Sequence, residues 1–262
     1  MGEFKSLADG FNINLIESKK DSCPICKGRG VTTKIGDNGL LQITGECKCV
    51  KVKRYRDILK RSGLGKKLEE CTFNSFVTDS RERLFAKKFC MNFVKEQEAD
   101  NLLLLGKPGT GKTHLAVAVC RELLEIHHKP LRYVSFRELM QEVKGVSLDQ
   151  EARINVMNKY KNVLFLFIDD LFKNTNTNYK TEQQITFEIL DYRYSNGKKT
   201  IITSQWDLEG LSKIDDAVTS RLAEKSGGYI LDFGKIGITS YRLEKARRDA
   251  EVLKKRLLQG EV

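Results

Sequence analysis

One stretch constrains the fold of this chain more than any other: an apolar run, NLLLL at 101–105, followed directly by GKPGTGKTHLAVAV. Its spacing is that of a phosphate-binding loop between a buried strand and a helix. Glycines let successive backbone amides point at phosphate oxygens, a lysine supplies a flexible positive charge, and a threonine hydroxyl can ligate Mg²⁺. The following helix directs its positive N-terminal end at the same anion. We therefore predict a nucleotide site with Mg²⁺, formed by Gly106, Pro108, Gly109, Thr110, Gly111, Lys112 and Thr113.

Four more short apolar runs, at 131–135, 163–168, 200–204 and 229–233, read as buried strands that alternate with helical stretches. Strands alternating with helices predict a five-stranded parallel sheet with helices on both faces, an α/β fold. In the first helical stretch, Phe85, Phe89 and Phe93 recur every four residues and suit one helix face. A later helix is expected to begin with a capping box formed by Thr181 and Gln184.

In VLFLFIDDLF (163–172), six apolar residues are followed by two acids, Asp169 and Asp170. Asp169 is placed to reach the Mg²⁺ held by Thr113, because ligands bind at the carboxyl ends of strands in open α/β sheets. Asp170 would orient or polarise the attacking water. An aspartate is one methylene shorter than a glutamate, and a misplacement of about 1 Å can cost on the order of a hundredfold in rate. We expect slow hydrolysis, with the bound nucleotide acting mainly as a conformational signal.

Seven cysteines are present, and four of them are clustered: Cys23, Cys26, Cys47 and Cys49. In a chain without an export signal, clustered thiols favour a metal over a disulfide. Four thiolates suit a closed tetrahedral site, and Zn²⁺ is the first choice. Free thiols, redox pairing and an iron–sulfur cluster are the alternatives. Cys71, Cys90 and Cys120 are scattered and are expected to act as small buried hydrophobes.

The formal net charge of +11 indicates a polyanionic partner, with nucleic acid the first choice and a merely solubilising surface the alternative. No apolar run approaches the roughly 20 residues of a membrane span. Charged residues near the N-terminus argue against a signal peptide, so we expect a cytoplasmic protein without a membrane partner.

Together these motifs resemble the AAA+ ATPases over residues 72–245, and within them the DnaC/DnaI group of replicative-helicase loaders. The group resemblance depends on GKPGTGKTHLA, FIDDL, TIITSQWDLEGL, VTSRL and GITSYR. It implies ATP/ADP as the nucleotide, a hexameric replicative DNA helicase and single-stranded DNA as partners, and self-association through nucleotide-bridged interfaces. Transposition-helper ATPases of the IstB type share most of this core.

The resemblance also implies roles for single residues. Thr203–Gln205, and Gln205 in particular, matches the first sensor, where the group usually has Asn. Arg221 matches the arginine finger that is donated to a neighbouring subunit, with an ordinary surface arginine on a helix as the alternative, and Arg242 matches a second sensor. Phe76 matches the segment that leads into the adenine pocket, with packing against the sheet as the alternative.

The helix after the second strand, SFRELMQEVKG, corresponds to a DNA-contacting helix of initiator-type relatives. Phe136 would stack on a base and Arg137 and Lys144 would meet phosphates, while core packing is the alternative for Phe136. We expect a zinc module at 1–66 that contacts the helicase, a linker at 67–80, and an AAA+ domain at 81–262 without a full C-terminal lid. The rival interpretations are a transposition helper and a non-catalytic zinc adaptor.

Overall fold

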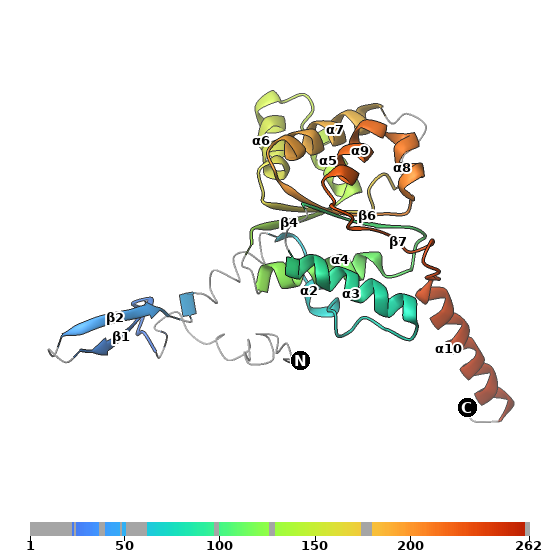
Figure 1. Ribbon diagram of the computed structural model, residues 1–262, viewed down its shortest axis with the longest axis horizontal. Helices are drawn as coiled ribbons and strands as arrows, with labels where there is room; N and C mark the ends of the chain where they lie inside the picture. The colour runs from blue at the N-terminus through green and yellow to red at the C-terminus, as the bar shows by residue number, and fades with distance from the viewer. Residues whose placement is uncertain are drawn as a thin grey trace.

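The computed structural model describes residues 23, 25–36, 40–47, 49–50, 62–96, 100–125, 129–173 and 180–259. It has a small N-terminal hairpin, which carries the cysteine cluster, and a larger layered domain (Figure 1). In the hairpin, β1 (Val31–Ile35) pairs antiparallel with β2 (Leu41–Glu46). This hairpin did not follow from the sequence reasoning, which identified the segment only as rich in turn residues.

The larger domain is built on the predicted five-stranded parallel sheet, which is confirmed. Its strand order is β4-β5-β6-β3-β7. Every residue of β3 and β5 is buried, as expected for strands covered on both faces. The predicted strands agree with the observed ones to within two residues at each end. Their bounds are β3 Asn101–Leu105, β4 Leu131–Ser135, β5 Phe165–Asp169, β6 Lys199–Ser204 and β7 Ile230–Asp232.

Helices cover both faces of the sheet, so that the strands separate two apolar cores (Figure 1). Alternate residues of β3 show this directly, because Leu102 and Leu104 belong to one core and Leu103 and Leu105 to the other. One face carries α2 (Lys67–Glu70), α3 (Arg81–Glu96) and α4 (Lys112–Glu125). The other carries α5 (Phe136–Gly145), α6 (Gln150–Lys161), α7 (Lys180–Ser195), α8 (Leu208–Ile214) and α9 (Asp216–Glu224).

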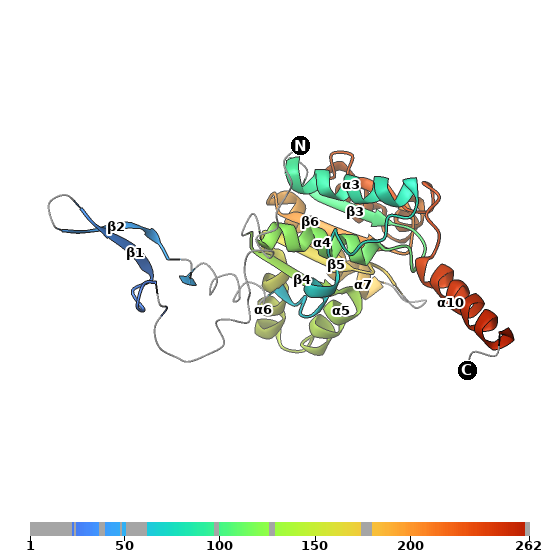
Figure 2. The same ribbon diagram turned by 90° about the horizontal axis from the view of Figure 1, so that it is seen from below.

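A single helix, α10 (Tyr241–Leu258), follows the last strand in the part of the chain that the structure describes. It buries none of its residues and extends away from the domain (Figure 2). Among the described helices, none is long and apolar enough to span a membrane.

Two local predictions differ from the structure in detail. The capping box at Thr181 is wrong, because α7 already includes Lys180 and Thr181 therefore lies inside the first turn. The phenylalanine face of α3 is graded: Phe93 is buried, Phe89 is half-buried and Phe85 is exposed. Cys90 and Cys120 are buried in the core as expected, and Cys71 is half-buried beside it.

Candidate functional site

The loop between β3 and α4 wraps around the side chain of Lys112. The ammonium donates hydrogen bonds to the carbonyls of Gly106 at 2.5 Å and Lys107 at 2.7 Å, and 5% of the residue is exposed. Burial lowers the pKa of Lys112 to about 8, although the carboxylates of Asp170 and Asp169 act in the opposite direction. The charge therefore lies inside the loop that would receive phosphates, close to two acids.

The glycines of this loop are required by its backbone. Gly109 and Gly111 have φ values of 81° and 100°, which other residues rarely adopt. A Cβ added at Gly111 would lie 2.7 Å from the ring of Phe76, so the loop also needs the space. Thr110 is buried and donates to the carbonyl of Lys107 at 3.0 Å, and Pro108 is exposed.

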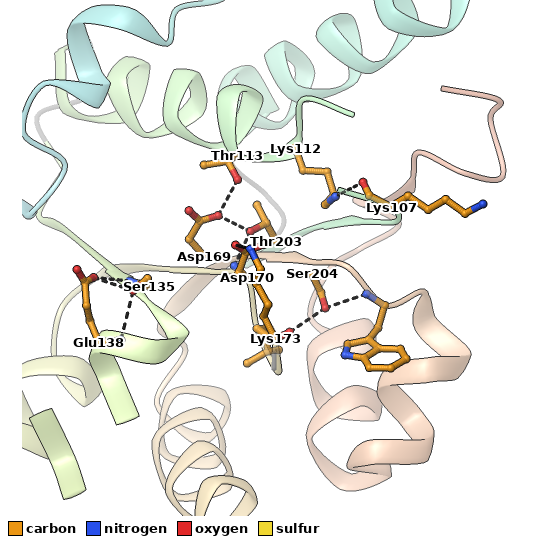
Figure 3. Close-up of polar contacts among 12 residues, drawn as sticks. Lys107, Lys112, Thr113, Ser135, Glu138, Asp169, Asp170, Lys173, Thr203 and Ser204 are labelled. Carbon is orange, nitrogen blue, oxygen red and sulfur yellow. Dashed lines mark hydrogen bonds and ion pairs between the residues drawn. The ribbon is translucent and has the colours of Figure 1, made fainter. Parts of the chain in front are cut away.

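Asp169 is the centre of the polar contacts beyond the loop (Figure 3). Its Oδ1 accepts a hydrogen bond from Thr113 Oγ1 at 2.8 Å and another from Thr203 Oγ1 at 2.6 Å. The register of the sheet brings these groups together, because Asp169 ends β5 and Thr203 lies near the end of the adjacent β6. Hydroxyl and carboxylate oxygens are the ligands that Mg²⁺ prefers, so Thr113 and Asp169 fit this ion.

Asp170 has an unusual backbone and a paired side chain. Its φ is +58°, in the left-handed region, and its amide donates to Thr203 Oγ1 at 2.9 Å. Its carboxylate forms an ion pair with Lys173 at 2.7 Å, and both side chains are about two-fifths exposed. The turn is fixed by further bonds to the end of β6: Leu171 N to Thr203 O, Ser204 Oγ to Leu171 O, and Trp206 Nε1 to Phe172 O.

Two residues that the sequence reasoning missed contact the other oxygen of Asp169. Tyr133, on β4, donates its hydroxyl to Asp169 Oδ2 at 3.2 Å. Lys67, on α2, donates to the Tyr133 oxygen at 2.5 Å and lies 3.8 Å from Asp169 Oδ2. Burial, reinforced by the charge of Asp169, raises the pKa of the Tyr133 hydroxyl, which keeps it a donor at neutral pH.

The four clustered cysteines form a second candidate site in the hairpin. Their sulfur atoms all lie within 4.8 Å of one another, with Cys23 and Cys47 3.7 Å apart and Cys26 and Cys49 3.5 Å apart. A tetrahedral zinc with four sulfur ligands at about 2.3 Å places the sulfurs about 3.8 Å apart. The chemistry and spacing of this donor set therefore fit Zn²⁺.

Comparison with known proteins identifies the family. The model of the family described as "IstB-like ATP binding protein" matches residues 43–248. The chain belongs to this family. Together with the parallel sheet and the phosphate-binding loop, this membership makes the protein an AAA+ ATPase and confirms the fold class expected from the sequence.

Proteins similar to this chain have varied names. The phage-like element PBSX protein XkdC of Bacillus subtilis (strain 168) is 29% identical over 245 residues, covering 88% of this chain and 90% of that protein. The replicative helicase loader DnaC of Escherichia coli (strain K12) is 28% identical over 157 residues, covering 59% of this chain and 63% of DnaC. A crystal structure of the DnaC helicase loader aligns with a TM-score of 0.50 and 25% identity, covering 61% of this chain and 91% of that one.

Three of the other predicted residues lie near the phosphate-binding loop. Phe76 is buried against Gly111, with its ring 5.4 Å from that of His114. The start of α10 meets the loop through a bond from the Tyr241 amide to the Gly109 carbonyl at 3.0 Å, and Arg242 is the next, exposed residue. Gln205 is half-buried just beyond β6, and the hydroxyl that touches both acids comes from Thr203 instead.

Arg221 lies near the amino ends of the strands, whereas Asp169 lies at the carboxyl end of β5. Together with residues at the amino ends of β3 and β6, it lines a small hollow. Its guanidinium pairs with Asp191 at 2.9 Å and lies over the rings of Phe187 at 5.2 Å and Tyr194 at 5.8 Å. Any contact between this residue and a nucleotide at the loop would therefore have to be made to a different copy of the chain.

The expectation that Phe136 stacks on a base is wrong for this structure. Its side chain is 3% exposed and packs against Phe172, with the ring centroids 5.3 Å apart. The helix spacing contained the signal, because Phe136, Leu139, Met140 and Val143 form a buried stripe at i, i+3, i+4 and i+7. Arg137 is exposed and Lys144 pairs with Glu182 at 2.9 Å.

Proposed function

We propose that this AAA+ ATPase loads a hexameric replicative DNA helicase onto single-stranded DNA, with ATP acting as a slow switch. The observation that carries the proposal is the similarity of the domain to the DnaC helicase loader in both sequence and structure. The chain spans 63% of the length of that DnaC relative, so the activity of the whole DnaC protein is here a proposal for this chain.

The contacts at the loop support a separate role for each residue. Lys112 would meet the β- and γ-phosphates, while Thr113 and Asp169 would hold Mg²⁺, which neutralises phosphate charge when bound. Thr203 positions both acids through its hydroxyl. Phe76 is proposed to shape the base pocket, and Gln205 and Arg242 to respond to the γ-phosphate.

The arrangement of Asp170 supports slow hydrolysis. The Asp170 carboxylate is occupied by its ion pair with Lys173 at 2.7 Å and its left-handed backbone fixes its direction, so it is not free to orient a water molecule. Hydrolysis would accelerate when Arg221 from a second copy adds its guanidinium, since such fingers contribute about 10³–10⁵ in rate.

A groove beside the acids supports contact with a phosphate backbone. It has a volume of about 810 Å³ and is lined by Arg137, Lys144 and Lys173, with Asp170 and Glu182 also present. Phe136 also lines this groove but is only 3% exposed, so we propose phosphate contacts there and no base stacking by that ring. Binding of this kind weakens steeply with salt.

We further propose that the cysteine cluster holds a structural Zn²⁺ in a helicase-contacting module within residues 1–66. Leu64 at its end and Leu68 in the expected linker 67–80 pack into the core of the ATPase domain at 81–262, so the docked part of the chain begins before the expected boundary. Metal analysis of the purified protein should give one zinc per chain. Substituting Cys26 by Ser should lower this content, and substituting the scattered Cys90 by Ser should not. Equal zinc content in both variants would exclude the cluster as the site.

The decisive experiment for the proposed function is size-exclusion chromatography with light scattering of the chain and a replicative helicase, with and without ATP. We expect an ATP-dependent complex that Lys112→Ala abolishes. The rival with a specific observation in its favour is a transposition helper, because the matching family is named for IstB. ATP-dependent binding to a transposase on double-stranded DNA, without binding to the helicase, would establish that rival. An adaptor that needs no nucleotide would keep helicase binding in Lys112→Ala.

A further inference from the structure

The segment 62–70 connects the cysteine hairpin to the ATPase domain and is docked firmly on it. Leu64 and Leu68 are 2% and 7% exposed and belong to the core on the α4 side of the sheet. Gly63 has a φ of +80°, and a Cβ there would lie 2.9 Å from the carbonyl oxygen of Tyr133. Arg121, on α4, donates to the Leu68 carbonyl at 3.1 Å. The segment is therefore packed against α4 and passes close to the backbone of Tyr133 on the edge strand β4 at Gly63.

Lys67 extends from this docked segment to the acid proposed to hold magnesium. Its ammonium lies 4.5 Å from the centroid of the Tyr133 ring and donates to the Tyr133 oxygen, and that hydroxyl donates in turn to Asp169 Oδ2. The two oxygens of Asp169 thus face different partners. Oδ1 faces Thr113 and Thr203, while Oδ2 faces Tyr133 and the charge of Lys67.

We propose that Lys67 and Tyr133 couple magnesium–nucleotide binding at the loop to the docking of segment 62–70, and so to the cysteine module before it. The proposal depends on the assignment of Asp169 as a magnesium ligand. A divalent cation and the Lys67 ammonium compete for the same, 8% exposed carboxylate, and they repel each other at short range. Magnesium–nucleotide binding therefore weakens the hold of Lys67 on Asp169 and loosens the segment.

The coupling acts in both directions. A partner that pulls on the cysteine module and detaches Lys67 strengthens magnesium–nucleotide binding by the same factor by which the nucleotide loosens the segment. Lys67 is 46% exposed, so water screens its charge and the coupling belongs at the low end of the usual range, about fivefold. This would connect the module with the nucleotide state without any direct contact between the two.

The test is hydrogen exchange of the full chain, followed by mass spectrometry of peptides that cover 62–70. We expect a non-hydrolysable ATP analogue with Mg²⁺ to speed exchange there about fivefold, and the same analogue in EDTA to have no such effect. Lys67→Met and Tyr133→Phe should abolish the magnesium-dependent change. Lys66→Met, at the exposed neighbouring position, should behave as the wild type.

Titration calorimetry on the same proteins gives a second readout. The ratio of nucleotide affinity with Mg²⁺ to affinity in EDTA should rise about fivefold in Lys67→Met and stay at the wild-type value in Lys66→Met. Unchanged exchange at 62–70 when calorimetry shows magnesium–nucleotide binding would overturn the coupling and leave the nucleotide site standing. A magnesium-dependent change of wild-type size in Lys67→Met would likewise overturn the coupling and leave the nucleotide site standing. Failure of the wild type to bind the nucleotide would remove the coupling and the site together, whereas failure to load a helicase would affect only the proposed function.

Discussion

Replacing Thr203 by Val tests whether one hydroxyl sets the position of both acids. Valine has nearly the same shape, and position 203 is fully buried, so little packing should change. Two interactions disappear: the 2.6 Å bond to Asp169 Oδ1 and the 2.9 Å bond from the Asp170 amide. A hydrogen bond to a charged group contributes about 1.5–3 kcal/mol, and a buried amide left without a partner costs about 1–3 kcal/mol.

The loss is partly offset because valine needs no hydrogen-bond partner, so we expect Thr203→Val to lower the free energy of unfolding by about 2–4 kcal/mol. A shift of about 1 Å in either carboxylate would also lower ATP turnover by on the order of a hundredfold. The assays are urea denaturation and steady-state hydrolysis at saturating Mg·ATP.

Two control variants separate positioning from general damage. Thr203→Ser keeps the hydroxyl and should retain most of the turnover. Thr186→Val removes another buried hydroxyl, which donates only to a helix carbonyl at 2.7 Å, and should leave turnover unchanged. Wild-type turnover in Thr203→Val, or the same fall in turnover in Thr186→Val, would refute the positioning role.

Three more changes test other contacts. Lys173→Ala should raise basal ATP turnover by no more than about fivefold, because an exposed ion pair is worth at most about 1 kcal/mol. The control Lys213→Ala should leave turnover unchanged, and a fall in turnover in Lys173→Ala would contradict masking of Asp170 by Lys173. Arg193→Met should lower the free energy of unfolding, measured in urea, by about 3–5 kcal/mol, because this buried guanidinium donates to five carbonyls and the hydroxyl of Thr200. A change within about 1 kcal/mol would contradict a structural role for Arg193. Nucleotide affinity measured in EDTA should fall about tenfold between pH 7 and pH 9. Burial lowers the pKa of Lys112 to about 8, so its ammonium loses its charge above that pH. An equal fall in affinity in Lys112→Met would mean that another group titrates.

The elements that could be predicted from the sequence are those specified by local pattern. Strands covered on both faces leave continuous apolar runs, and the phosphate-binding loop needs glycines at fixed positions, so both are visible without a structure. The chemistry of Cys23, Cys26, Cys47 and Cys49 is equally local, since two close pairs suffice to suggest one metal. The hairpin between them was missed because its strands are short and half-exposed to fully exposed.

The missed contacts depend on tertiary arrangement. Thr203 meets Asp169 only because β6 pairs with β5 in one parallel register, and a threonine at a strand end carries no signal of that pairing. Lys67 reaches the same acid only because segment 62–70 docks on the edge strand. Family resemblance placed the first sensor at Thr203–Gln205, and the hydroxyl that contacts Asp169 belongs to Thr203, the first residue of that range.

The positions of Arg221 and Lys112 together support the proposed slow switch. Lys112 lies at the carboxyl ends of the strands and Arg221 lies at their amino ends. One copy of the chain therefore cannot bring both side chains to the same triphosphate. Arg221 is nevertheless one-third exposed, and Asp191, Phe187 and Tyr194 hold it in a fixed direction before any partner arrives. If it serves a neighbouring copy, turnover per chain must rise with protein concentration, and Arg221→Ala must remove that rise without changing nucleotide affinity in the dilute protein. A turnover that is independent of concentration and already fast in dilute solution would mean that Asp170 needs no help, and the switch would then have to lie elsewhere.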